Sequence, residues 1–259
     1  MAHSKKRVAM VGLGGRCRLY VDALMGDYHD RYELVGLCDQ NSVRLQHHAD
    51  RVAEKHKTHA PPLYDASDFD RMIRETKPDC VIVTSIDRTH HEYIIRAMDA
   101  GCDVITEKPL TIDIPKCQAI LDAIDRTGRD LKVTFNYRYA PSRTKVKELL
   151  MAGAIGSVTS VHFEWLLNTC HGADYFRRWH RDKRNSGGLM VHKSTHHFDL
   201  LNWWLDSAPD TVFGMGALAF YGRANAEARG DSHPYYRATG SPAAAKDPFA
   251  LHLNDGDEL

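Results

Sequence analysis

The sequence predicts an α/β protein whose first half is a doubly wound parallel sheet. Strand and helix patterns alternate from about residue 7 to residue 136, which is typical of a parallel sheet with helices on both faces. A glycine-rich turn joins the first strand to the first helix. An acid, a base and a proline follow a later strand, at the edge where open α/β sheets bind ligands. We therefore expect a ligand site at the carboxyl edge of this sheet.

Each predicted element has its own signal. Short apolar or β-branched runs predict strands at residues 7–11, 33–38, 80–85, 104–106 and 132–136. Helical periodicity predicts helices at residues 17–25, 43–56, 68–75, 115–127 and a helix ending at residue 100. Gly101 and Gly128 are expected to close two of these helices, and Pro115 suits a first helical turn.

The turn after the first strand contains Gly12, Gly14, Gly15, Arg16 and Cys17. The first glycine permits a tight turn, and the second lets the backbone approach a pyrophosphate at the helix N-terminus. Cys17 replaces the third glycine of the usual dinucleotide-binding pattern. The turn predicts a cofactor site, although glycine turns between a strand and a helix are also common without one.

Asp39 follows the second strand. A carboxylate there can accept hydrogen bonds from both ribose hydroxyls and would repel a 2′-phosphate, so NAD is favoured over NADP. Arg44 lies close enough in sequence to leave NADP possible. The alternative is a helix cap, because Asp39, Asn41 and Ser42 precede the next helix.

Glu107, Lys108 and Pro109 follow the strand at residues 104–106. Proline cannot continue a strand ladder, so the chain turns and holds Lys108 at the rim of the sheet. A lysine beside a cofactor can hydrogen-bond and polarise a substrate hydroxyl. The alternative is a solvated ion pair at the end of a surface strand.

The composition restricts the class of protein. The chain has 259 residues, with 34 basic and 34 acidic residues, which argues against a nucleic-acid or anionic-membrane partner. The apolar run after Lys5-Lys6-Arg7 is too short for a signal peptide, and no stretch approaches a membrane span. The six cysteines form no C-x-x-C pair. We therefore expect reduced thiols and a cytoplasmic protein.

The second half begins with a predicted amphipathic helix at residues 141–152 and a predicted strand at 158–166. A long polar and aromatic segment follows, with Trp179, His180 and Arg181. Aromatic faces and guanidinium groups suit a polyhydroxylated substrate. The alternatives are a basic surface loop or a subunit contact.

A helix is predicted at residues 191–205, where His192, His196 and Asp199 share one face at spacings of four and three residues. Histidine titrates near neutrality, which suits proton removal from a hydroxyl. Two histidines four residues apart can also bind zinc, with His180, Cys170 or His171 completing the site. A third interpretation makes the histidines satisfied polar groups of the core.

Taken in order, the motifs resemble the Gfo/Idh/MocA group, which includes glucose–fructose oxidoreductase and inositol dehydrogenase. The resemblance rests on the glycine turn at 12–17, Asp39, the segment 85–90, Glu107-Lys108-Pro109, Asn136-Tyr137-Arg138-Tyr139 with Pro141, and Gly187-Gly188 followed by His196 and Asp199. It implies an NAD(P)-binding Rossmann domain at residues 1–137. It also implies a substrate-binding and oligomerisation domain at 138–259, with an open antiparallel sheet, and a homo-oligomer for the full-length protein.

The resemblance also implies roles for residues. Lys108 would be catalytic with Glu107 in support, Ser85 and His90 would lie at the cofactor, and His196 would be the general acid/base. Many members have an aspartate four residues before that histidine, where this chain has His192, which we expect to act as a catalytic partner of His196. The substrate would be bound by Arg138, Trp179, His180, Arg181, Lys193 and Asp199. The family's usual chemistry needs no metal, so none is expected.

A last strand is predicted at residues 211–218, and the sequence after it offers no closing element. We therefore expect the second domain to be incomplete.

The sequence predicts an NAD-dependent oxidoreductase that oxidises a secondary hydroxyl of a sugar, cyclitol or glycoside. The alternatives are an NAD-cycling glycoside hydrolase or lyase without net redox change, and a non-catalytic NAD-binding regulatory protein.

Overall fold

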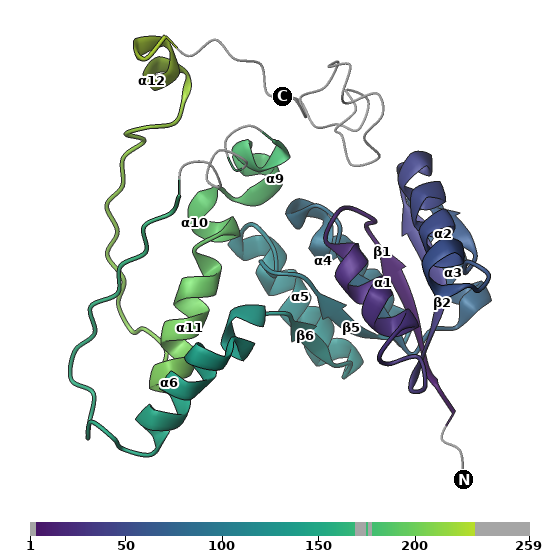
Figure 1. The fold of residues 1–259 in the computed structure, drawn as a ribbon, viewed down its shortest axis with the longest axis horizontal. Helices are drawn as coiled ribbons and strands as arrows, with labels where there is room; N and C mark the ends of the chain where they lie inside the picture. Colours follow the sequence, from purple (N-terminus) through teal and green to yellow (C-terminus); the bar gives the residue numbers. More distant parts are fainter. Residues whose placement is uncertain (1–3, 169–174, 176–177, 231–259) are drawn as a thin grey trace.

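A six-stranded parallel sheet organises the first half of the chain. The computed structural model describes residues 4–168, 175 and 178–230. The strands are β1 Lys6–Val11, β2 Tyr32–Asp39, β3 Leu63–Asp65, β4 Cys80–Val83, β5 Asp103–Thr106 and β6 Leu131–Val133. They lie in the order β3-β2-β1-β4-β5-β6, and every neighbouring pair is parallel (Figure 1). This confirms the predicted α/β class and doubly wound sheet.

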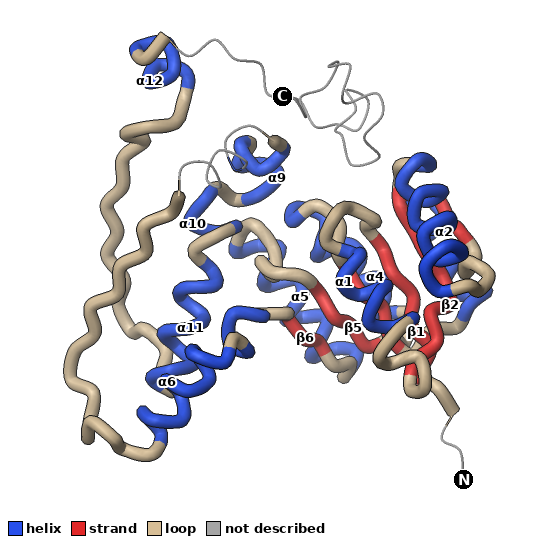
Figure 2. Tube along the Cα trace, viewed as in Figure 1, coloured by secondary structure: helices blue, strands red, loops and turns tan. Residues whose placement is uncertain are grey.

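Helices cover both faces of the sheet (Figure 2). The helices α1 Cys17–Met25 and α2 Ser42–His56 pack on one face, against Val8, Met10 and Ile82. The other face is covered by α3 Phe69–Thr76, α4 His90–Asp99 and α5 Ile114–Thr127. Because successive strand residues point to opposite faces, each strand contributes to both layers.

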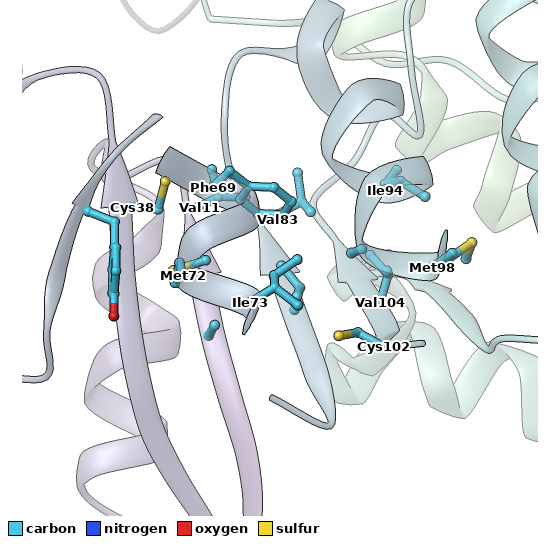
Figure 3. Packing of buried hydrophobic residues seen from close by; sticks show 14 of the residues in the cluster. Val11, Cys38, Phe69, Met72, Ile73, Val83, Ile94, Met98, Cys102 and Val104 are labelled. Carbon is cyan, nitrogen blue, oxygen red and sulfur yellow. The ribbon is translucent and has the colours of Figure 1, made fainter. Parts of the chain in front are cut away.

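The second of these layers is shown close up in Figure 3. Val11, Val83 and Val104 of the sheet meet Phe69 and Ile94 of the helices, and each is almost fully buried. All four residues of β4 are buried, as expected for a central parallel strand covered on both faces. Burying a large apolar side chain stabilises the fold by roughly 1.5–3 kcal/mol.

Local signals in the sequence account for several helix ends. The Asn41 side chain accepts hydrogen bonds from the backbone N–H groups of Val43 and Arg44, so Asn41, not Asp39, caps α2. Gly128 ends α5 in the left-handed conformation, as predicted. The short edge strand β3 was not predicted. It has three residues and follows Pro61-Pro62 directly.

The second half of the described chain is helical. It contains the 3₁₀ turns η3 Asn136–Tyr139 and η4 Trp179–Arg181 and the helices α6 Pro141–Met151, α9 Lys183–Ser186, α10 Leu189–His192, α11 Thr195–Leu205 and α12 Arg223–Ala228. Helices α6 and α11 pack together, and the Trp204 side chain donates a hydrogen bond to the carbonyl oxygen of Arg143. None of the helices in the described part of the chain has the length and apolar character needed to cross a bilayer.

Two predicted strands of the second half are wrong. Residues 158–166 and 211–218 form no strand and are drawn as loops in Figure 2. β-branched and aromatic residues favour a strand only where a neighbouring strand supplies backbone partners and packing. In residues 158–166 the aromatic side chains find helical partners instead, because Phe163 and Trp165 contact His197 of α11.

The predicted helix at residues 191–205 is also wrong as a single element. The chain forms the short helix α10, turns at Lys193 and Ser194, and begins α11 at Thr195. His192 therefore belongs to a different helix from His196 and Asp199, and the continuous stripe that we expected does not form. The periodicity was correct for α11, but it could not reveal a break between two helices that carry the same pattern.

The order of the strands reverses beside β1, which has β2 on one side and β4 on the other. Helix α1, which follows β1, and helix α4, which follows β4, lie on opposite faces of the sheet, so a crevice opens where these two strands end. The fold thus directs attention to the chain just after Val11 and just after Val83.

The core assignment can be tested with two matched substitutions. Ile94 is fully buried and Ile114 is 83% exposed, and both lie in helices. We expect Ile94→Ala to lower the free energy of unfolding by about 2–5 kcal/mol because it leaves a cavity. Ile114→Ala should change it by less than about 0.5 kcal/mol. Urea unfolding followed by circular dichroism measures both, and equal effects would contradict the described core.

Candidate active site

A cleft with a volume of about 640 Å³ opens at the reversal point of the sheet. This volume is within the usual range for small-molecule sites. The chain after β1, β4 and β5 lines one side, and residues of η3, η4, α10 and α11 line the other. Most of the predicted site residues line it: Gly12, Gly14, Gly15, Arg16, Asp39, Ser85, His90, Glu107, Lys108, Trp179, His180, His192, Lys193 and His196.

The glycine turn forms one end of the cleft. Gly12 has a φ of +88°, and a Cβ atom there would lie 2.3 Å from the backbone nitrogen of Ser85, so only glycine fits. At Gly14 and Gly15 a Cβ atom would meet nothing within 4 Å. The open space at these two residues lies just before the N-terminus of α1, where backbone N–H groups favour an anion. The turn therefore fits the pyrophosphate of a dinucleotide.

Asp39 lies at the same end, at the end of β2. Its carboxylate accepts hydrogen bonds from the backbone N–H groups of Leu13, at 2.5 Å, and Asn41, at 2.8 Å. The Arg44 guanidinium lies 3.8 Å from Oδ1, the same oxygen that accepts from Asn41. These contacts tie Asp39 to the glycine turn and hold it in the wall of the cleft, where a ribose would lie beside the pyrophosphate.

Glu107 and Lys108 follow β5 and point to different partners. The Glu107 carboxylate accepts hydrogen bonds from Arg16 Nε at 2.6 Å and from the Tyr20 hydroxyl at 2.7 Å. Lys108 Nζ donates to the carbonyl oxygen of His192 at 2.9 Å. Burial lowers the pKa of Lys108, while the charges of Asp87 and Glu107 act in the opposite direction. The Lys108 side chain thus extends from the end of β5 to α10 on the other side of the cleft.

His90 fixes two of these loops to each other. Its Nδ1 lies 2.9 Å from the carbonyl oxygen of Pro109, and its Nε2 lies 3.1 Å from that of Ser85. The ring is almost fully buried at the start of α4. His90 therefore joins the segment after β4 to the Glu107–Pro109 turn, as well as lining the cleft.

His192 enters the cleft from the second half of the chain. Its Nδ1 lies 2.5 Å from Oδ2 of Asp87, which belongs to the 3₁₀ turn η2 Asp87–Thr89. Burial, followed by the charge of Lys108, lowers the pKa of His192 to about 3. Burial raises the pKa of Asp87 to about 7. Burial thus disfavours the charged form of both groups, and the two groups titrate as a pair.

His196 lies in α11 and stacks on Tyr137, with ring centroids 3.9 Å apart and an angle of 7° between the planes. Burial and the charges of Lys108 and Lys193 lower its pKa to about 3. Lys193 is only 9% exposed, and its Nζ donates to the Tyr137 hydroxyl at 2.9 Å. Tyr137 thus positions both the neutral imidazole and the second ammonium of the cleft.

Aromatic rings form the wall opposite the sheet. Trp179 stacks on His180, with centroids 3.8 Å apart, and the His180 ring lies 4.5 Å from that of His192. Tyr175 contacts the His192 ring at 5.5 Å. A wall of this kind offers flat apolar faces together with polar ring edges.

Three predicted substrate residues do not line the cleft. Arg138 and Asp199 form a bidentate salt bridge, with Arg138 Nε 2.8 Å from Asp199 Oδ2, and this bridge joins η3 to α11. Arg181 also lies outside the lining residues. A bidentate salt bridge uses the most directional N–H donors of the guanidinium. Arg138 therefore holds η3 against α11.

Sequence analysis missed several lining residues, above all Asp87, Tyr137 and Arg178. Asp87 lies in the segment 85–90, which carries part of the family resemblance, but no role was assigned to its carboxylate from the sequence. Cys170 and His171, considered as zinc ligands, lie outside the described residues. Within the described ranges, no group of three or more His, Cys, Asp or Glu side chains is arranged to hold a metal ion.

The chain matches two models of one oxidoreductase family. Residues 6–135 match the NAD-binding Rossmann fold of the GFO_IDH_MocA oxidoreductases, and residues 147–253 match their C-terminal alpha/beta domain. The first match confirms NAD as the predicted cofactor, and the glycine turn and Asp39 are the described residues that fit it.

Individual proteins give the same relationship. The putative oxidoreductase YteT of Bacillus subtilis is 42% identical over 218 residues, which are 84% of this chain and 50% of YteT. The crystal structure of myo-inositol 2-dehydrogenase from Lactobacillus plantarum has a TM-score of 0.66 at 22% identity, over 78% of this chain and 57% of that one, and it shares the fold. The WlbA dehydrogenase of Bordetella pertussis, in complex with NADH and UDP-GlcNAcA, has a TM-score of 0.65 at 25% identity, over 79% and 58%. The chain spans about half the length of YteT.

The glycine turn can be tested as a cofactor site. We expect Gly14→Ala to leave the melting temperature within about 2 °C, because its methyl group would contact no atom of the chain. The same methyl group would fill the space for the pyrophosphate, so the dissociation constant for NADH should rise at least about tenfold, a loss of about 1.4 kcal/mol. Fluorescence titration with NADH and thermal unfolding give the two values. Unchanged NADH affinity would contradict the assignment, and Gly12→Ala, which clashes with Ser85, should instead lower stability.

Proposed function

The chain belongs to the Gfo/Idh/MocA family of NAD-binding oxidoreductases, and on this premise we propose that it oxidises a secondary hydroxyl group of a sugar, cyclitol or glycoside. Membership confirms the resemblance drawn from the motifs. The observation that carries the proposal is the convergence of Lys108, after β5, with His192 and His196 of the second half in one cleft beside the dinucleotide turn.

Lys108 is suited to hold the substrate oxygen. An ammonium group has three N–H donors, and the carbonyl oxygen of His192 accepts one of them. The other two are available for an alcohol oxygen in the cleft. A hydrogen bond from the ammonium stabilises the negative charge that develops on this oxygen as its proton leaves. Burial strengthens the effect, because charges interact more strongly away from water.

The proton of the hydroxyl needs an acceptor, and the cleft holds two neutral imidazoles. Both His196 and His192 have a lowered pKa, caused first by burial and then by Lys108. Each ring therefore has an unprotonated nitrogen at neutral pH and is able to take up a proton. NAD, when bound, supplies the hydride acceptor, and the side chains of the cleft supply positioning and proton transfer.

The rings of Trp179, His180 and Tyr137 support a polyhydroxylated substrate, because the carbon faces of sugars and cyclitols pack on aromatic faces. Lys193 and Asn136 add polar groups at the same side. The relatives point to the same substrate class, since one is a myo-inositol dehydrogenase and another was crystallised with UDP-GlcNAcA.

A second function is favoured by the presence of two imidazoles in place of one. Transient oxidation of a hydroxyl acidifies the neighbouring C–H bond, and a second base could then remove that proton. The result is elimination or cleavage of a glycoside with no net redox change. Release of an aglycone without accumulation of NADH would identify this reaction. The third alternative, a regulatory NAD-binding protein, predicts that the chain binds NAD without catalysis, so that replacing Lys108 changes no activity.

Three wider predictions stay as proposals. We propose a division at residues 137/138 between the Rossmann domain and the substrate domain. We propose a cytoplasmic location because the five cysteines among the described residues are free thiols, four of them buried. We propose self-association of the full-length protein, supported by exposed apolar side chains in the second half such as Trp165, Leu166 and Phe213.

Oxidation can be tested with this chain, NAD and a panel of inositols, aldoses and methyl glycosides. We expect NADH absorbance to increase with at least one secondary alcohol, because Lys108 and the imidazoles converge in the cleft. Stopped-flow absorbance in the NADH band measures the rate. If NADH binds but no polyol yields NADH or a released aglycone, the proposed oxidation is rejected.

Lys108→Met tests the role of the ammonium group. We expect kcat to fall by roughly 10²–10⁴-fold, because the charge that stabilises the substrate oxygen is lost. NADH affinity should change by less than about threefold, because the glycine turn and Asp39 remain. Lys116→Met, at a lysine of α5 paired with Asp113 outside the cleft, is the matched control. Equal activity of the two variants would exclude a catalytic Lys108.

A further inference from the structure

Asp87 is a buried carboxylate with no role in the function proposed above. It follows β4 in the first half of the chain, is 3% exposed, and lies with Oδ2 2.5 Å from Nδ1 of His192. The two residues are 105 positions apart in sequence. A buried carboxylate at this distance from an imidazole controls which ring nitrogen carries the proton.

We infer that Asp87 is a positioning residue that keeps the proton of His192 on Nδ1, so that Nε2 accepts the substrate's hydroxyl proton and the His192–Asp87 pair carries it away from the cleft. This inference rests on the proposed oxidation. It assigns proton removal to His192, where the family resemblance had assigned it to His196.

The geometry around the two imidazoles favours His192. A neutral imidazole has one N–H donor and one acceptor nitrogen. At His192 the carboxylate of Asp87 takes the donor side, so the acceptor nitrogen is Nε2. At His196, Nδ1 is buried and finds no hydrogen-bond partner among the residues that the structure describes. The His196 ring is held by stacking on Tyr137, which does not select a tautomer.

Lys108 links this pair to the substrate oxygen. Its ammonium donates to the backbone carbonyl of the same His192, so the last residue of the short helix α10 both fixes the ammonium and carries the ring. Lys108 itself follows β5. One residue of α10 therefore sets the position of the ring relative to the ammonium.

The electrostatic setting lets the pair work near neutral pH. Burial raises the pKa of Asp87 to about 7 and lowers that of His192 to about 3, so it disfavours the charged form of both partners. The pair titrates as a unit. The other titratable groups around it are His90, Glu107, Lys108, Lys193, Tyr175 and His180.

The hydroxyl proton moves to Nε2 of His192, and the proton on Nδ1 moves to Oδ2 of Asp87. The electron pair of the O–H bond forms the second C–O bond. The electron pair of the C–H bond leaves the carbinol carbon as hydride for NAD. The alcohol becomes a ketone, and Asp87 ends the step as a neutral acid.

Asp87→Asn tests the inference, because the Asn Oδ1 can still accept a hydrogen bond from Nδ1 but cannot take its proton. We expect kcat to fall at least about 10²-fold, with KM and NADH affinity within about threefold of the original. The original chain should lose kcat/KM as pH falls below about 7, where Asp87 becomes protonated. This acid limb should disappear in Asp87→Asn. Asp103→Asn, at the opposite end of β5 and paired with Lys6, is the matched control and should keep both values.

A role in structure alone predicts otherwise: Asp87→Asn would keep the acid limb and at least half of kcat, and this result would overturn the inference. A double variant gives a second test. In a His192→Gln chain, adding Asp87→Asn should change kcat by less than about twofold, because both changes break one pathway. A full additional loss would show that Asp87 acts apart from His192.

Imidazole ¹⁵N NMR gives a readout that does not depend on activity. In the original chain, with NADH bound, we expect His192 to be protonated on Nδ1 and its Nδ1 resonance to titrate near pH 7. The Asp87→Asn chain should lack this titration. Protonation of His192 on Nε2 would overturn the inference even in an active enzyme. If no polyol is oxidised but the NMR result holds, only the proposed oxidation fails.

Discussion

The hydrogen bond from Lys108 to the carbonyl oxygen of His192 holds the two halves of the cleft together. An ammonium group removed from water is costly unless its donors are satisfied and negative charge lies nearby. Here the backbone of α10 satisfies one donor, and Asp87 and Glu107 supply the nearby carboxylates. The rest of the site follows from this requirement, because each of those carboxylates is in turn fixed by a partner from another element.

Those partners come from distant parts of the chain. Glu107 is held by Arg16 and Tyr20 from the glycine turn and α1, and Asp87 is held by His192 from α10. Arg16 of the glycine turn is therefore linked through the Glu107 carboxylate to the backbone N–H of Lys108. The glycine turn and the proposed substrate side of the cleft share one hydrogen-bonded network, in which low dielectric makes each bond stronger.

Most of the first half could be predicted from the sequence because its signals are local. Gly128 ends a helix through its own backbone freedom, and the buried strand at residues 80–83 is apolar throughout. Strand β3 was missed because three residues after two prolines carry too little pattern. Lys108 and His196 could be placed in one site because the motifs that carry them resemble a family in which both residues are expected to be catalytic.

The second half could not be predicted to the same extent, because its features depend on tertiary contacts. Helix periodicity continues through Lys193 and Ser194, although the chain breaks there to turn His192 toward Asp87. Arg138 and Asp199 belong to the motifs that carry the family resemblance, but they pair with each other outside the cleft. The sequence alone does not show whether an arginine or a carboxylate forms a salt bridge within the protein or contacts a ligand.

The position of Asp87 also accounts for the departure at His192. The resemblance leads one to expect a carboxylate four residues before His196, on the same segment as the base. In this chain a histidine occupies that position, and the carboxylate comes from the turn after β4. The pair therefore crosses between the two halves of the cleft. In the inferred mechanism His192 is the base, so the packing of α10 against the sheet places this base beside its carboxylate partner and also places Lys108 beside His192.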